Sequence, residues 1–199
     1  MNELEKLLNG NRNFVNGTPT AENKCLKTLQ KFKDFQTPHA IILSCSDSRV
    51  VPEIIFDVGI GELFVIRTAG ATIGENVIES IEFAFDELQI PLLVVLGHDN
   101  CGVVTYAAKN PDGSEHFHDI TSQVHEVLDC ETLCYNELAK KHTLNVTKII
   151  KRDSAILKKA IEDGKLQVVR AHFHVDTGAV TMLEDDEHAS HARRRQKIK

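Results

Sequence analysis

The chain has 199 residues, of which 42% are hydrophobic and 26% charged, so it suits one globular domain with a single core. Its net charge of −6 argues against a general nucleic-acid-binding protein, which would need a basic face. No apolar run approaches the roughly 18 residues of a membrane span, and the N-terminal residues lack the basic start and apolar core of a signal peptide. We therefore expect a cytoplasmic protein that binds neither nucleic acid nor membrane.

In chain order, the apolar residues first recur at helical spacing over 2–15 and again over 21–33, which predicts two amphipathic helices. These helices define an N-terminal helical arm, residues 1–34, which carries no catalytic signature. Because the arm is separable from the rest of the chain, we expect it to pack on a partner subunit.

A strand–helix–strand pattern comes after the arm and predicts an α/β domain over 35–183. We expect a central, mostly parallel four-stranded sheet with an added antiparallel edge strand, flanked by helices. The predicted strands are 39–43, 62–68, 91–96, 166–171 and, at the edge, 173–180. The predicted helices are 52–57, 75–89, 102–108, 121–142 and 145–162, and 109–120 is predicted as a loop. Residues 184–199 form a charged tail that we expect to be flexible.

Three residues that can bind a metal ion stand just after two of the predicted strands. Cys45 comes after the first strand, and His98 and Cys101 come after the third. The carboxyl ends of neighbouring parallel strands lie at one edge of a sheet, where ligands bind in open α/β folds. Two thiolates and one imidazole suit zinc better than magnesium or calcium, and three protein ligands with an open position are typical of a catalytic site.

Taken singly, each of these residues has a simpler interpretation. A cysteine after an apolar run is most often a packed core residue, and an isolated His-x-x-Cys is weak evidence. The joint pattern is stronger, because both halves follow strands and Asp47 and Arg49 accompany Cys45. The chain has five cysteines, an odd number that disfavours a disulfide framework. We interpret Cys130 and Cys134, four residues apart, as packed or free thiols rather than a second metal site.

The sequence Cys-Ser-Asp-Ser-Arg-Val at 45–50, with Gly-His-x-x-Cys-Gly at 97–102, closely resembles the β-class carbonic anhydrases. The resemblance covers most of the chain and includes 53–56, 61–67, 69–70, 79–84 and 177–180. It implies a zinc lyase, carbonate dehydratase (EC 4.2.1.1), that reversibly hydrates CO2 to bicarbonate and a proton. It also implies one Zn²⁺ per subunit and a homodimer or homotetramer with its active site near the subunit boundary.

The resemblance implies a catalytic role for Asp47 and Arg49. Asp47 can accept a hydrogen bond and orient the zinc hydroxide toward CO2, while Arg49 can hold Asp47 in a bidentate pair. In some family members the matching aspartate becomes the fourth zinc ligand and closes the site. Members with a bicarbonate-controlled closed state often carry a tryptophan where this chain has Ile42, although the matching Arg67 is present. That departure favours an open resting site or weaker control by bicarbonate.

Four further residues match positions that bind substrate in the family. Gln36 matches a glutamine that donates a hydrogen bond to substrate, although it is also an ordinary turn residue before Thr37-Pro38. Phe64 and Phe83 resemble the apolar wall that holds CO2, and the family often has tyrosine at the second position. Gly102 could offer its backbone N–H to a bound anion at a helix N-terminus.

Four other histidines are candidates for proton relay, and two other functions remain as alternatives to CO2 hydration. His116, His118, His172 and His174 could relay protons, but ordinary surface histidines are the simpler interpretation, and the last two alternate along a strand and so share a face. The same zinc site could serve a hydrolase of CS2 or carbonyl sulfide, because fold does not fix substrate. A non-catalytic zinc-binding scaffold is a third alternative, which predicts loss of Asp47 or Arg49; both are present.

Overall fold

The computed structural model describes residues 1–21, 25–113, 116–129 and 134–184. Cys130 and residues 185–199 of the predicted tail lie outside the described residues. Over these described ranges, none of the helices combines the length and apolar character that crossing a bilayer would need.

A five-stranded sheet in the order β2-β1-β3-β4-β5 forms the centre of the fold. Its strands are β1 (Ala40–Cys45), β2 (Leu63–Thr68), β3 (Leu92–His98), β4 (Gln167–Phe173) and β5 (Val180–Met182). The first four are parallel and β5 is antiparallel to β4, which confirms the predicted fold class. The edge strand begins at Val180 rather than at 173, because β4 continues to Phe173 and a turn with Gly178 in a left-handed conformation (φ 73°) follows.

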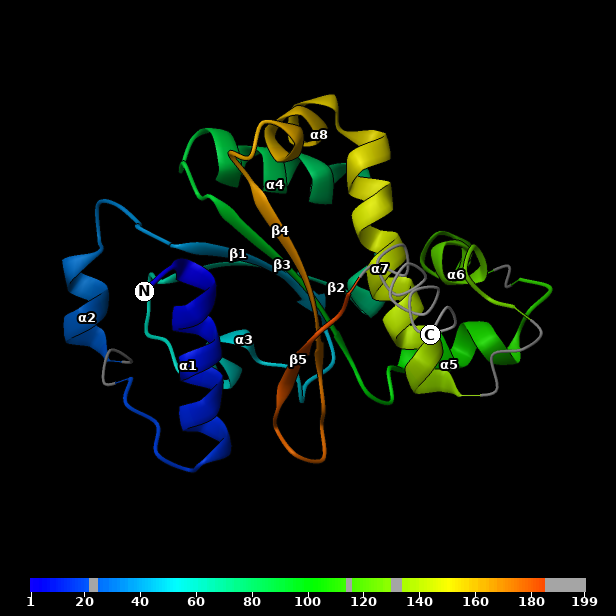
Figure 1. The fold of residues 1–199 in the computed structure, drawn as a ribbon, viewed down its shortest axis with the longest axis horizontal. Coiled ribbons are helices and arrows are strands. Elements are labelled where there is room, and N and C mark those ends of the chain that lie inside the picture. The colour runs from blue at the N-terminus through cyan, green and yellow to red at the C-terminus, as the bar shows by residue number, and fades with distance from the viewer. Residues whose placement is uncertain (22–24, 114–115, 130–133, 185–199) are drawn as a thin grey trace, which may run out of the picture.

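Helices cover both faces of this sheet (Figure 1), which agrees with the apolar character of β1 and β3 along their whole length. The helices are α1 (Glu3–Val15), α2 (Leu26–Lys31), α3 (Pro52–Ile55), α4 (Glu75–Asp86), α5 (Gly102–Lys109), α6 (His118–His125), α7 (Tyr135–Asp153) and α8 (Ala155–Glu162), with a 3₁₀ turn η1 (Ala69–Ala71). Residues of α1 and α3 pack on one face, and residues of α4, α7 and α8 pack on the other. Figure 1 shows α5 and α6 beside the lower part of α7.

The two helices predicted over 121–142 and 145–162 had the wrong boundaries, because three helices cover this part of the chain. The pattern over 121–142 belongs to two helices. The first of them, α6, begins at His118, inside the predicted loop, and ends at His125. The next helix, α7, runs from Tyr135 through the predicted break to Asp153, and the hydroxyl of Thr143 bonds to Ala139 O within it, so this polar residue stays helical. Ser154 then has an extended backbone and its hydroxyl accepts the N–H of Leu157, which starts α8 as a separate helix.

The two helices of the N-terminal arm differ in how they contact the rest of the chain. The side chain of Asn11 in α1 donates to Ile55 O (3.1 Å) and Gly178 O (2.9 Å) and accepts from the N–H of Val180 (2.9 Å). In α2, which is shorter than the predicted helix over 21–33, Leu26 and Leu29 are 69% and 50% exposed. The first helix is therefore fixed to its own chain, whereas the second leaves an apolar side uncovered.

Candidate metal centre

The carboxyl ends of β1 and β3 bring Cys45, His98 and Cys101 together. The two strands are adjacent and parallel, with Ser44 opposite Leu96, so Cys45 at the end of β1 lies close to His98 at the end of β3. Cys101 follows as the residue before α5. One ligand atom from each residue lies within 4.8 Å of the other two, and all three residues are buried. The group that the motifs predict is therefore assembled in one place.

His98 offers one ring nitrogen to a metal ion. Its Nδ1 donates to the backbone oxygen of Asp99 at 2.9 Å, which fixes the tautomer and leaves a lone pair on Nε2. That Nε2 is buried and has no hydrogen-bond partner among the described residues. A cavity of about 10 Å³, lined in part by His98, Cys45 and Cys101, lies beside it and has room for a single ion or water. The unpartnered nitrogen and the sulfur-rich donor set both fit zinc.

Two backbone N–H groups stabilise negative charge on the sulfur of Cys45. The N–H of Gly70 lies 3.3 Å from Sγ, and that of Asp47 lies 3.4 Å from it. The adjacent Cys101 thiol, with smaller contributions from His98 and these N–H groups, lowers the pKa of Cys45 against the effect of burial. The pKa of the Cys101 thiol is raised by its hydrogen bond to the Cys45 sulfur and by burial. A second thiolate at this position would repel the first. Two neighbouring thiolates therefore need a cation to balance them.

Asp47 and Arg49 form a forked ion pair next to this group. Arg49 donates from Nε to Oδ1 (3.0 Å) and from Nη2 to Oδ2 (2.8 Å), and its backbone N–H also reaches Oδ1 (3.0 Å). These bonds from Arg49 hold the pKa of Asp47 well below its usual range. Arg49 Nη2 also lies 3.3 Å from Asn100 O, which joins the two loops that carry the cysteines. Asp47 is thus bound to Arg49 rather than placed as a fourth ligand.

Two supporting residues have roles that the motifs did not assign. Arg67 in β2 donates from Nε to Cys45 O (3.2 Å) and from Nη2 to Asp47 O (2.7 Å), so it fixes the backbone of the Cys45 loop. His142 in α7 is buried and its Nε2 lies 2.9 Å from Gly70 O. The sequence marked Arg67 only as a possible regulatory residue, and it gave no signal for His142, which is 72 residues from its partner.

The four predicted substrate residues are not all at the metal centre of the same chain. Gln36 is exposed before β1, Phe64 is half-buried in β2, and Phe83 in α4 is 50% exposed. Within the described part of the chain, none of these three lines the cavity beside the ligands. Gly102 does lie at the centre, as the first residue of α5, and it borders a second hollow of about 170 Å³ that Tyr106 also lines.

Comparisons with known proteins identify the family. A family model described as carbonic anhydrase matches residues 40–180. Carbonic anhydrase 2 of Mycobacterium tuberculosis is 35% identical over 186 residues, which cover 89% of this chain and 90% of that protein. The β-carbonic anhydrase of Coccomyxa, solved in complex with acetazolamide, is 26% identical with a TM-score of 0.67 and covers 92% of this chain and 87% of its own.

A further solved structure, that of the β-carbonic anhydrase CcaA, has a TM-score of 0.70 at 22% identity and covers 91% of this chain and 95% of its own, which shows a shared fold. The family match extends over both strand ends that carry the predicted ligands. The similarity to the relative at 35% identity covers 89% of the chain. On this evidence, the chain belongs to the β-class carbonic anhydrases.

Proposed function

We propose that this protein is a zinc enzyme that reversibly hydrates CO2 to bicarbonate and a proton. The observation that carries the proposal is the buried group of Cys45, His98 and Cys101 in a chain of this family. Cys45 and Cys101 would hold the ion through sulfur and His98 through Nε2. A zinc ion in such a site lowers the pKa of water to about 7 and so supplies a nucleophile at neutral pH.

Asp47 and Arg49 are the residues that we propose act on the reactants. The carboxylate of Asp47 accepts a hydrogen bond from the reacting water and turns an oxygen lone pair toward CO2. Arg49 fixes the direction of that carboxylate, because its guanidinium bonds to both oxygens and to Asn100 O. Arg67 holds the backbone of Cys45 and Asp47, so the acceptor keeps its place relative to the ligands.

Substrate contacts from Gln36, Phe64 and Phe83 would come from a second copy of the chain. None of the three lines the metal cavity of its own chain, and Gln36 and Phe83 are exposed. Gly102 would bind bicarbonate through its backbone N–H at the start of α5. Measurement of KM and kcat for Gln36→Ala tests this part, because loss of a substrate contact changes hydration without changing zinc content.

We propose a homodimer or homotetramer in a reducing compartment such as the cytoplasm, with α2 of the 1–34 arm packed on a partner of the 35–183 domain. The exposed Leu26 and Leu29 support this arrangement, and a structural relative from Sordaria macrospora is described as tetrameric. Light scattering on wild type and a Leu26→Glu, Leu29→Glu variant tests it. A mass equal to one chain for the wild type would contradict the proposal.

The alternatives are less well supported. A non-catalytic zinc scaffold would not need the Asp47–Arg49 pair, which is present with two side-chain bonds. Hydrolysis of CS2 or carbonyl sulfide would use the same centre, but the named relatives are carbonic anhydrases. Parallel assays with CO2 and CS2 separate these two activities.

The main test is stopped-flow CO2 hydration by wild type and Asp47→Ala, with the zinc content of both proteins measured. We expect activity in wild type and its loss in Asp47→Ala at unchanged zinc content. Asp163→Ala is a matched control, because Asp163 forms an exposed pair with Lys159 (2.9 Å) at the end of α8. Stoichiometric zinc with no hydration by wild type between about pH 7 and 9 would contradict the proposed enzyme.

A further inference from the structure

Asp99, His172 and His174 form a second group of metal-capable side chains. One ligand atom from each lies within 4.8 Å of the other two. Asp99 and His172 are buried, and the side chain of His174 is 27% exposed, so the group has one side open to solvent. None of the three belongs to the zinc ligands or to the residues proposed to act on CO2.

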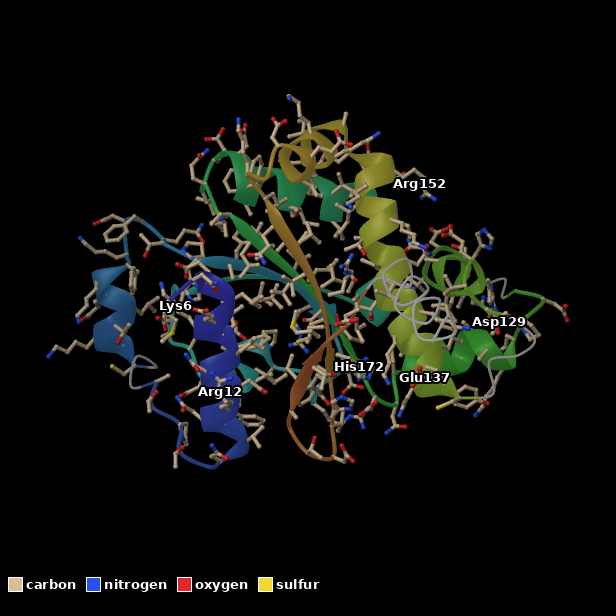
Figure 2. All side chains as sticks on the ribbon, viewed as in Figure 1. Lys6, Arg12, Asp129, Glu137, Arg152 and His172 are labelled. Carbon is tan, nitrogen blue, oxygen red and sulfur yellow. The ribbon has the colours of Figure 1, made fainter. Side chains whose placement is uncertain are left out.

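The sheet brings these three residues together. His172 and His174 are two apart in and just after β4, so their side chains lie on the same face. The N–H of Asp99 bonds to Phe173 O at 3.1 Å, which places Asp99 beside the residue between the two histidines. Figure 2 shows His172 near β5, and the strand pairing sets it opposite Thr181.

Both imidazoles point at one carboxylate. His172 Nε2 lies 2.8 Å from Asp99 Oδ1, and His174 Nδ1 lies 3.1 Å from Oδ2. Neighbouring ligands of a tetrahedral zinc ion are separated by about 3.4 Å, given metal–ligand bonds of about 2.1 Å. The two nitrogen–oxygen distances are therefore close to the distances between ligand atoms of one zinc ion. The centroids of the two rings are 5.2 Å apart.

Thr181 supports the orientation of His174 that a cation requires. Its Oγ1 lies 3.0 Å from His174 Nε2 and can accept a hydrogen bond from that nitrogen. With the proton on Nε2, the lone pair of Nδ1 faces the carboxylate side of the ring. Such a contact to the other ring nitrogen is the usual support for a metal-binding histidine.

We propose that Asp99, His172 and His174 bind a second divalent transition-metal ion of the Zn²⁺, Co²⁺ or Ni²⁺ type. Two imidazoles and one carboxylate match these ions, whereas Mg²⁺ and Ca²⁺ prefer oxygen ligands. The cation enters from the side of His174 and replaces the hydrogen bonds between the rings and Asp99. The backbone oxygen of Asp99 also accepts a hydrogen bond from Nδ1 of His98, a proposed zinc ligand. An ion bound to the Asp99 side chain therefore also restrains the backbone that orients His98.

The test uses the full-length protein loaded with zinc and then titrated with Co²⁺ alone. Uptake is measured by metal analysis after removal of free ion, together with the absorption spectrum. We expect wild type to take up one further Co²⁺ per chain without a sulfur-to-cobalt charge-transfer band, because the second group has no thiolate. Extra thermal stability on adding Co²⁺ is the second readout.

Two variants make the test specific. In His174→Asn the amide can keep a hydrogen bond to Asp99 in place of Nδ1 but is a poor metal ligand, so we expect the further Co²⁺ to be lost while the fold and the first zinc ion remain. His118→Ala removes an exposed histidine from α6 and should keep full uptake. No further uptake by wild type, uptake with a thiolate band that reports exchange at the cysteine site, or unchanged uptake in His174→Asn would overturn the proposal.

Discussion

His142 donates a hydrogen bond from Nε2 to the backbone oxygen of Gly70, at 2.9 Å, and Gly70 in turn donates its N–H to the sulfur of Cys45, at 3.3 Å. His142 is only 3% exposed, and this burial lowers its pKa, so the ring is a neutral donor at physiological pH. A helix residue thus fixes the backbone donor to the sulfur of Cys45, a proposed zinc ligand, without touching Cys45 itself.

Replacing His142 by leucine should therefore weaken zinc binding. The Gly70 carbonyl would lose its buried partner, and the N–H that bonds to Cys45 would no longer be held in place. Loss of such a supporting contact typically costs 10- to 100-fold in metal affinity. In His142→Gln the amide nitrogen can take the place of Nε2, so we expect affinity close to wild type. Competition with a chromophoric chelator measures both values.

His125→Leu is the matched control for this comparison. His125 Nε2 also donates to a backbone oxygen, that of Ala107 at 3.0 Å, but the contact joins α6 to α5 rather than supporting Gly70. An equal loss of affinity in His125→Leu would show that the effect is general destabilisation. A His142→Gln variant as weak as His142→Leu would contradict the role of the hydrogen bond.

Arg49→Lys should lower activity while zinc stays bound. Lysine keeps the positive charge but cannot form the two parallel bonds to Asp47, so the carboxylate loses its fixed direction. We expect kcat/KM for CO2 hydration to fall about 10- to 100-fold with unchanged zinc content. Arg152→Lys is the control, because Arg152 makes a similar forked pair with Asp153 (2.6 and 3.0 Å) on the surface. Full activity in Arg49→Lys would refute the positioning role.

The grouping of the three proposed metal ligands could be predicted from the sequence, because they stand at the ends of strands that are apolar along their length. Buried parallel strands read as continuous apolar runs, and their carboxyl ends meet at one edge of the sheet. Local pattern was therefore enough to place Cys45 near His98, and β1 and β3 are adjacent as that argument requires. The βαβ unit was also predicted correctly, and so was the presence of an antiparallel edge strand, but that strand runs over Val180–Met182 rather than 173–180.

The supporting contacts and helix ends could not be predicted in this way. The bond from His142 to Gly70 joins residues 72 apart, and nothing in either local sequence indicates the other. The break at Ser154 depends on tertiary structure as well as on capping, because its hydroxyl also bonds to Glu82 Oε1 (2.6 Å) in α4. A serine inside an apolar helical pattern gives no such information, so two helices were assigned wrong boundaries.

Gly97→Ala should destabilise the fold next to the metal centre. A Cβ at this position would lie 2.1 Å from Thr143 Oγ1 and 3.4 Å from His172 Nδ1, so α7 and β4 leave no room for it. Overpacking of this kind costs about 1 to 3 kcal/mol in the free energy of unfolding. Thr143→Ala removes the closest atom, and we expect it to recover part of the loss in the double variant. Denaturant unfolding of wild type, the two single variants and the double variant measures the coupling.

Gly74→Ala separates this crowding from the general effect of removing a glycine. No atom lies within 4 Å of a Cβ at Gly74, and its φ of −130° is open to any residue. We expect a change of about 0.5 kcal/mol or less. A Gly97→Ala protein as stable as wild type, or a double variant no more stable than Gly97→Ala, would contradict the structural account.

Asp57 accepts hydrogen bonds from the N-terminal arm, and Asp57→Asn should remove the dependence of this contact on pH. Burial alone would raise the pKa of Asp57, but bonds from the N–H groups of Thr20 (2.7 Å) and Ala21 (3.0 Å), with others from the Thr20 hydroxyl and Asn13, lower it. A carboxyl whose pKa is lower in the folded than in the unfolded chain contributes stability above its unfolded value of about 3.9. That contribution is lost as the pH falls through the folded value.

At about pH 7 we therefore expect Asp57→Asn to unfold at lower denaturant concentration than wild type, and the difference to shrink as the pH falls below about 4. Asparagine tolerates the left-handed backbone of this position (φ 47°), so the variant changes charge without adding strain. Both proteins lose bound zinc in acid alike, so the difference between them at each pH reports Asp57 alone. Asp112→Asn, on an exposed turn, should show no such dependence. A gap between Asp57→Asn and wild type that stays constant down to about pH 2 would mean that ionised Asp57 does not hold the arm.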